Sequence, residues 1–119
     1  MTKLLFLISL IVFVSCKNQE TEAKKISNQS PTELGKEIFE GKGNCVACHL
    51  VNQKVVGPSI QEMSKIYKAK KGNIIDFLIH DAAPIIDPSQ YEVMKANFVI
   101  TKAMSDQELK AIESYIYSN

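Results

Sequence analysis

From residue 30 onward, apolar side chains recur at helical spacing behind three similar starting signals. A serine is followed three positions later by a glutamate at Ser30, Ser59 and Ser105, and this spacing is typical of the capping box that begins an α-helix. Apolar residues then recur every three or four positions, which predicts one buried face on each helix. The predicted faces consist of Leu34, Ile38 and Phe39, of Ile60, Met63 and Ile66, and of Leu109, Ile112, Tyr115 and Ile116.

The first two helices have predicted ends, and a further helix is expected before the last one. Gly41 and Gly43 should end the first helix, and the second should reach about Tyr67. Asn73 precedes another apolar segment, which predicts a helix over residues 74–82.

The segment 83–104 is predicted to be a long connection. Pro84 and Pro88 interrupt helical propagation, because proline lacks the backbone N–H and clashes with the preceding turn. We therefore expect at most one helical turn, near Tyr91. Connections of this length within compact domains are usually functional. No segment alternates apolar and polar residues with a period of two, so the predicted fold is all-α, a small domain of four to five helices.

The N-terminal residues resemble an export signal rather than part of the fold. Lys3 precedes an apolar run over 4–14, which is too short for a mature membrane-spanning helix and suits the core of a signal peptide. The run ends near Cys16 without the small-residue cleavage site of an ordinary secretory signal. We expect a bacterial lipoprotein signal peptide over 1–15 and a lipid on Cys16. A plain secretory signal with a free Cys16 thiol and an uncleaved anchor are the alternatives.

The expected lipoprotein would be exported and anchored to a bacterial membrane, facing the periplasm or the cell surface. Lys17 stands where an aspartate retains many lipoproteins in the inner membrane, so the outer membrane is slightly favoured. Residues 16–31 form a polar linker that cannot bury enough apolar surface to fold alone, and residues 32–119 form one domain. Beyond the signal, thirteen lysines balance thirteen acidic residues without any arginine, which gives no indication of nucleic-acid binding.

The candidate chemistry lies in the pentapeptide Cys-Val-Ala-Cys-His at positions 45–49. Two thiols three positions apart with an adjoining imidazole match the attachment signature of c-type haem. Cys45 and Cys48 would form thioethers with one edge of the porphyrin, and His49 would reach the iron beneath the ring. The motif therefore predicts a covalent haem with a proximal histidine, which is a redox centre.

Two other readings of a Cys-x-x-Cys pair are possible. A thioredoxin-type site would require a surrounding βαβ pattern, which the chain does not show. A zinc site would need two more ligands, and the remaining candidates, Cys16 and His80, are far apart. Export favours the haem hypothesis, because covalent c-type haem is assembled on the outer side of energy-transducing membranes.

The chain resembles the class I monohaem cytochromes c over nearly all of residues 32–119. The resemblance depends first on the 45–49 motif after one N-terminal helix, and then on Gly57 and Pro58. In that family the carbonyl of the corresponding proline accepts a hydrogen bond from the proximal histidine, which implies that Pro58 orients His49. The family's fold implies a helical domain wrapped around one covalent haem c.

Three further positions resemble the crossing of the terminal helices in this family. Gly35 in the first helix would permit a close approach, and Phe39 and Tyr115 would pack across the contact. The resemblance therefore implies that the first and last helices of the domain pack directly against each other.

The resemblance also implies a methionine as the second axial ligand, whose thioether stabilises ferrous iron. Met94 is the leading candidate, because it lies in the predicted loop where this family places that ligand. Met104, directly before the last helix, and Met63, on a helix face, are more simply core residues. His80 ends a predicted helix and is more simply a surface or capping residue. An open or water-ligated iron is the remaining alternative.

These features predict a one-electron carrier rather than an enzyme. With His49 and Met94 both bound to iron, no site remains for a small-molecule substrate, so the expected partners are redox proteins of the cell envelope. The protein could instead be a haem subunit of a larger oxidoreductase. A five-coordinate haem enzyme or sensor, such as a peroxidase, and an envelope thiol protein without haem are the alternatives from other classes.

Overall fold

The computed structural model describes residues 28–80 and 82–119. Over these residues the fold is all-α, as predicted, with six α-helices where four to five were expected, two short 3₁₀ helices and no β-strand. The predicted signal peptide over 1–15, the lipidation site Cys16 and most of the linker 16–31 lie outside the described residues. The elements are α2 (Pro31–Glu40), η1 (Cys45–Ala47), α3 (Ile60–Lys70), α4 (Ile74–Ile79), η2 (Pro88–Gln90), α5 (Tyr91–Lys95), α6 (Phe98–Thr101) and α7 (Asp106–Tyr117).

The long helices begin at the predicted capping signals. The Ser30 hydroxyl oxygen accepts the Glu33 N–H at 3.2 Å, and the Glu33 carboxylate accepts the Ser30 N–H at 3.0 Å. Ser105 and Glu108 make the same reciprocal pair at the start of α7, and the Ser59 side chain caps α3 by accepting a backbone N–H. Each cap satisfies a donor that the first helical turn leaves unpaired, which is worth about 1 kcal/mol.

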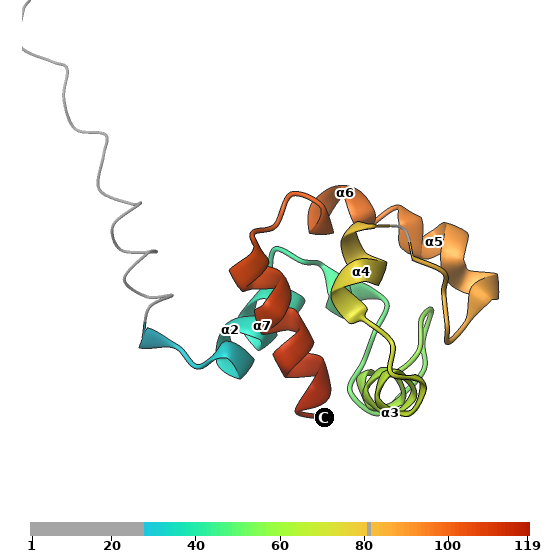
Figure 1. Cartoon of the computed structure of the whole chain (residues 1–119), viewed down its shortest axis with the longest axis horizontal. Helices are drawn as coiled ribbons and strands as arrows, with labels where there is room; N and C mark the ends of the chain where they lie inside the picture. The colour runs from blue at the N-terminus through green and yellow to red at the C-terminus, as the bar shows by residue number, and fades with distance from the viewer. Residues whose placement is uncertain (1–27, 81) are drawn as a thin grey trace, which may run out of the picture.

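The first and last helices pack directly against each other, as the resemblance implied (Figure 1). Gly35 lies at this contact, where a Cβ atom would be 1.9 Å from the carbonyl oxygen of Ala111 on α7. The rings of Phe39 and Tyr115 pack edge to face beside it, with centroids 5.4 Å apart. The missing side chain at Gly35 is therefore what allows the two backbones to approach.

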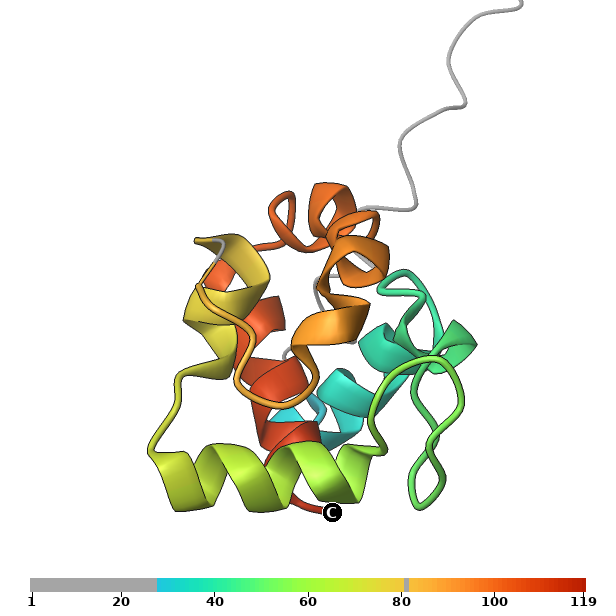
Figure 2. The same ribbon diagram turned by 90° about the vertical axis from the view of Figure 1, so that its right-hand side faces the viewer.

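The two middle helices differ in length from the prediction. α3 runs across the bottom of the view in Figure 2 and continues to Lys70, beyond the expected end near Tyr67. It ends where Lys71 adopts a left-handed backbone conformation with φ 52°. α4 is shorter than predicted and ends at Ile79, where His80 forms its C-cap.

The segment 83–104 is more helical than predicted, because it contains η2, α5 and α6. Pro88 begins η2 instead of preventing it, since a proline at the first helical position loses no hydrogen bond. Helices as short as α5 and α6 are not stable alone. Tyr91 and Phe98 pack on Phe77 of α4, with ring centroids 6.1 and 5.5 Å from it. Tertiary packing therefore stabilises α5, which lies at the turn expected near Tyr91, and α6, which the local sequence did not indicate.

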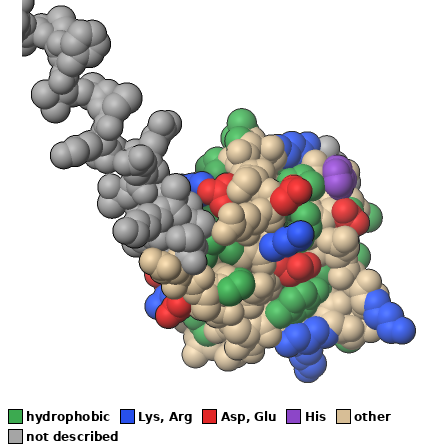
Figure 3. All heavy atoms as spheres, turned by 60° about the vertical axis from the view of Figure 1, so that its left-hand side comes forward, with side chains coloured by type: hydrophobic (Ala, Val, Ile, Leu, Met, Phe, Trp, Pro, Cys, Tyr) green, Lys and Arg blue, Asp and Glu red, His purple; other side chains and the backbone are tan. Residues whose placement is uncertain are grey.

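Charges are interspersed over the surface rather than gathered by sign. Figure 3 shows lysine and acidic side chains mixed over one face. Some of them pair between elements, as Lys42 does with Glu108 of α7. Within the part of the chain that the structure describes, no helix is long and apolar enough to cross a membrane.

The contact between α2 and α7 predicts that Gly35→Ala destabilises the domain. The added methyl group would overlap the Ala111 carbonyl, so the helices must separate, and overpacking of this kind lowers the free energy of unfolding by about 1–3 kcal/mol. Denaturant unfolding of the protein measures the change. Lys36→Ala, at the exposed neighbouring position, is the control and should change it by less than about 0.5 kcal/mol. Equal stability of the two variants would contradict the prediction.

Candidate haem site

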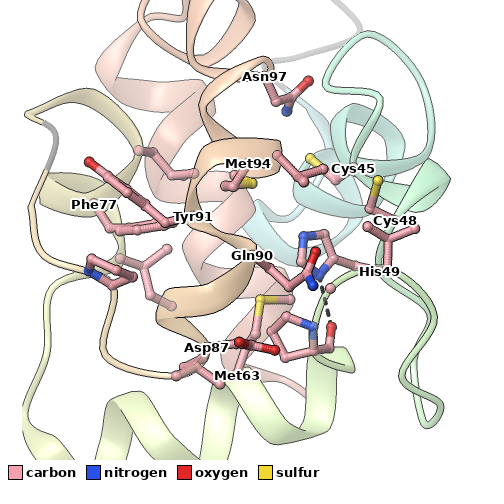
Figure 4. Close-up of a pocket in the computed structure, with 18 of the residues that line it drawn as sticks. Cys45, Cys48, His49, Met63, Phe77, Asp87, Gln90, Tyr91, Met94 and Asn97 are labelled. Atoms are coloured by element: carbon pink, nitrogen blue, oxygen red, sulfur yellow. Dashed lines mark hydrogen bonds between the residues drawn. The ribbon is translucent and has the colours of Figure 1, made fainter.

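A cavity of about 400 Å³ lies between the helices, and the 45–49 motif forms part of its wall (Figure 4). Helices α3, α4 and α7 contribute to its other walls, together with residues 87–97. We call residues 87–97 the strap; this segment contains η2 and α5. Most side chains that line it are apolar, such as Phe77 of α4 and Ile112 of α7. Cofactor-sized sites typically measure about 300–1,000 Å³, so the cavity has the size and character of such a site.

The 3₁₀ helix η1 brings both thiols and the imidazole to this cavity. The backbone N–H groups of Cys48 and His49 both donate to the Cys45 carbonyl, at 3.1 and 3.0 Å, which folds the motif into a compact turn. All three side chains line the cavity (Figure 4). Burial raises the pKa of the Cys45 thiol to about 11. This sulfur is therefore neutral, as it also is in a thioether.

The geometry supports neither of the two alternative hypotheses for the Cys-x-x-Cys pair, a thioredoxin-type site or a zinc site. A thioredoxin-type motif lies near a βαβ unit, and the described residues contain no β-strand. The described residues contain no group of three or more His, Cys, Asp or Glu side chains that could hold a metal ion. Of the two extra zinc ligands considered, Cys16 lies outside the described residues, and His80 is exposed and hydrogen-bonded to Asp76 at 3.2 Å.

The His49 ring is held in one orientation. Its Nδ1–H donates to the Pro58 carbonyl oxygen at 2.8 Å, which is the hydrogen bond that the resemblance implied. A carbonyl oxygen only accepts, so Nδ1 carries the proton and Nε2 keeps its lone pair for a metal ion. A Cβ atom at Gly57 would lie 2.3 Å from the ring, and Phe39 packs edge-on with its centroid 6.4 Å away.

The charge state of His49 also suits an iron ligand. Burial lowers the pKa of His49, and the hydrogen bond to Pro58, which acts in the opposite direction, does not reverse that effect. The imidazole is therefore neutral at pH 7. A histidine must be neutral to coordinate a metal ion.

Two of the four candidates for the second axial ligand line the cavity. Met94 reaches it from α5, and Met63 reaches it from α3. Met104 packs against the core and His80 is exposed at the end of α4, and neither lines the cavity. Met94 is the one that lies on the segment where the resemblance places the ligand.

Polar residues that the sequence analysis did not single out also line the cavity. Asp87, Gln90 and Asn97 belong to the strap (Figure 4). The Asn97 amide donates to the carbonyl of Gly43 at 3.0 Å, across 54 residues of sequence. Asp87 accepts a hydrogen bond from a lysine 33 residues away. No local motif marks partners at such separations.

The fold and this site define a small helical domain built to hold a haem, and comparison with known proteins gives its family. Residues 32–119 match the family described as Cytochrome c, and the chain belongs to this family. Over 40 residues it is 40% identical to cytochrome c-551 from Azotobacter vinelandii. That match covers 34% of this chain and 48% of the relative, about half of the relative's length.

Family membership establishes one covalently bound c-type haem as the cofactor. The cavity fits this group, because its apolar lining suits a porphyrin and its polar contacts fix one imidazole. Cys45 and Cys48 would hold the haem through thioethers, and His49 would bind its iron. The bound haem supplies one-electron chemistry at that iron.

The packing behind the proximal ring predicts that Gly57→Ala displaces His49, because the new methyl group would overlap the imidazole. We expect shifted proton resonances of the His49 ring and a loss of about 1–3 kcal/mol of unfolding free energy. NMR and denaturant unfolding of the holoprotein measure these changes. Val55→Ala, at a half-exposed position in the same loop, should leave both nearly unchanged. Unmoved His49 resonances in Gly57→Ala would refute the prediction.

Proposed function

We propose that this protein is a one-electron carrier whose haem is attached at Cys45 and Cys48 and coordinated by His49 and Met94. The observation that carries the proposal is that all four side chains line one apolar cavity. With both axial positions occupied by side chains, the iron exchanges electrons without binding a substrate, as expected of a carrier rather than an enzyme.

Met94 is the best supported second ligand for two reasons. It lies on the strap, a segment separate in sequence from the proximal motif, and it reaches the same cavity as His49. A thioether ligand stabilises ferrous iron and raises the reduction potential. Met63 also lines the cavity, but it lies on α3 and not on the segment where the resemblance places the ligand.

We further propose that the domain works in the cell envelope, tethered by a lipid on Cys16. The apolar run over 4–14 ahead of this cysteine supports export, and more than one acyl chain makes such anchoring stable. The polar segment up to residue 31 would serve as the linker between the lipid and the domain. Its partners would be redox proteins of the envelope, with the outer membrane slightly favoured by Lys17.

The ligation predicts that Met94→Ala abolishes the weak near-infrared absorption band that arises from methionine bound to ferric iron. Covalent haem should remain, because both thiols and His49 are unchanged, and the reduction potential should fall with the loss of the thioether. Absorption spectra and a redox titration of the purified holoprotein measure these effects.

Met104→Ala is the matched control for this substitution, because Met104 does not line the cavity, and it should retain the band. A Met94→Ala spectrum identical to that of the original protein would move the ligand elsewhere. A protein that lacks the band before any substitution would support a five-coordinate haem enzyme or sensor instead.

The lipid anchor predicts that Cys16→Ser releases the holoprotein from membranes into the soluble fraction. Haem attachment should be unaffected, because Cys16 precedes the domain. Fractionation of the producing cells, followed by a haem stain, measures the distribution. Haem-stained protein that stays with the membranes after this substitution would refute the anchor and leave the site unaffected.

A further inference from the structure

The strap bears Met94 and is tied to the rest of the domain at several points. In its middle, Tyr91 packs against Phe77 and Phe98 through ring contacts. At its C-terminal end, the Asn97 amide donates to the Gly43 carbonyl. These contacts fix the middle and the far end. Just before the strap, the Lys70 ammonium donates to the Ile85 carbonyl at 2.7 Å, and a further interaction holds Asp87 itself.

That interaction is an ion pair between Lys54 and Asp87. The Lys54 ammonium donates to the Asp87 carboxylate at 2.7 Å. The second carboxylate oxygen accepts the Ser89 hydroxyl at 2.5 Å, which orients the acid toward its partner. The Asp87 side chain is 18% exposed and that of Lys54 is 56% exposed, so the pair lies at the boundary between the cavity wall and solvent.

Lys54 is itself fixed to the proximal ligand. Its backbone forms an isolated antiparallel bridge with His49. One end of the ion pair is therefore joined to the residue that would bind iron from one side. The other end, Asp87, begins the segment whose Met94 would bind it from the other side.

We infer that Lys54 and Asp87 are positioning residues that hold the strap against the proximal segment and thereby keep Met94 on the iron. The inference rests on the proposed coordination by His49 and Met94. Neither residue would touch the reacting atoms. Each acts by limiting how often the strap opens.

Opening of the strap has a measurable consequence. When Met94 leaves, a free ligand such as imidazole can bind ferric iron, and its apparent affinity is proportional to the fraction of open protein. Because the ion pair is partly exposed, it contributes modestly and is weakened by salt. Breaking it should raise imidazole affinity about two- to fivefold, and added salt should have a similar effect on the original protein.

The expected result differs if the two charges act only through their electrostatic field at the iron. Removal of the lysine and removal of the acid change the charge near the iron in opposite directions, so they would change anion binding with opposite signs. Imidazole is neutral as a ligand, so such a field hardly affects its binding. Equal increases in imidazole affinity for both substitutions would therefore indicate that the ion pair holds the strap in place.

The test uses imidazole titrations of the ferric holoprotein, followed by loss of the methionine–iron band. Lys54→Met, Asp87→Ala and the double variant should each raise imidazole affinity by a similar factor, because each breaks the same contact. From low salt to about 0.5 M KCl, affinity should rise in the original protein and stay constant in the double variant. Lys36→Met, which breaks the exposed pair of Lys36 with Glu40 on α2, should change nothing.

Unchanged imidazole affinity in both single variants would overturn the inference, as would additive effects in the double variant or a salt effect that persists there. A variant that folds poorly would be seen by circular dichroism, and the salt series on the original protein then decides the question. If Met94 does not bind the iron, the original protein would lack the methionine–iron band before any ion pair is broken. That result separates failure of the proposed ligation from failure of the inference about Lys54 and Asp87.

Discussion

Because a carbonyl oxygen can only accept, the hydrogen bond between Pro58 and Nδ1 of His49 leaves Nε2 of the imidazole unprotonated. Burial holds the ring neutral, and Gly57 leaves no room for it to move backward. A single fixed imidazole beside two thiols on one turn determines where a haem can lie. The rest of the domain is arranged around that position: one set of helices packs behind the ring, and one segment crosses in front of it.

The two sides of the cavity are held by different kinds of interaction. Behind the proximal motif, α2 and α7 are in backbone contact at Gly35, and aromatic rings fill the adjoining space. Such close packing tolerates little change. The strap has a small aromatic cluster around Tyr91 and two polar ties, at Asp87 and Asn97. Polar ties at a surface are weaker than a packed core, so the strap is the side where local opening would be easiest.

This asymmetry bears on function within the family. A haem domain that keeps both axial side chains is suited to electron transfer, and the same domain with an open strap would offer its iron to small ligands. Under the proposed coordination, the difference between these two activities would depend on the stability of the strap. The proposed lipid tether is separate from this chemistry, because Cys16 precedes residues 32–119, which match the family.

The sequence by itself determined the helix starts at its serine caps, the all-α fold and the haem motif, because each of these is encoded within a few neighbouring residues. It could rank Met94 above the other candidates only through a resemblance. Tertiary structure alone decided that α6 forms beyond the single turn expected near Tyr91, because Phe77 of α4 packs against Phe98. It also paired Lys54 with Asp87 and brought Met94 to the cavity that holds His49. Those contacts join residues far apart along the chain, and their partners are set by how helices pack and not by any local spacing.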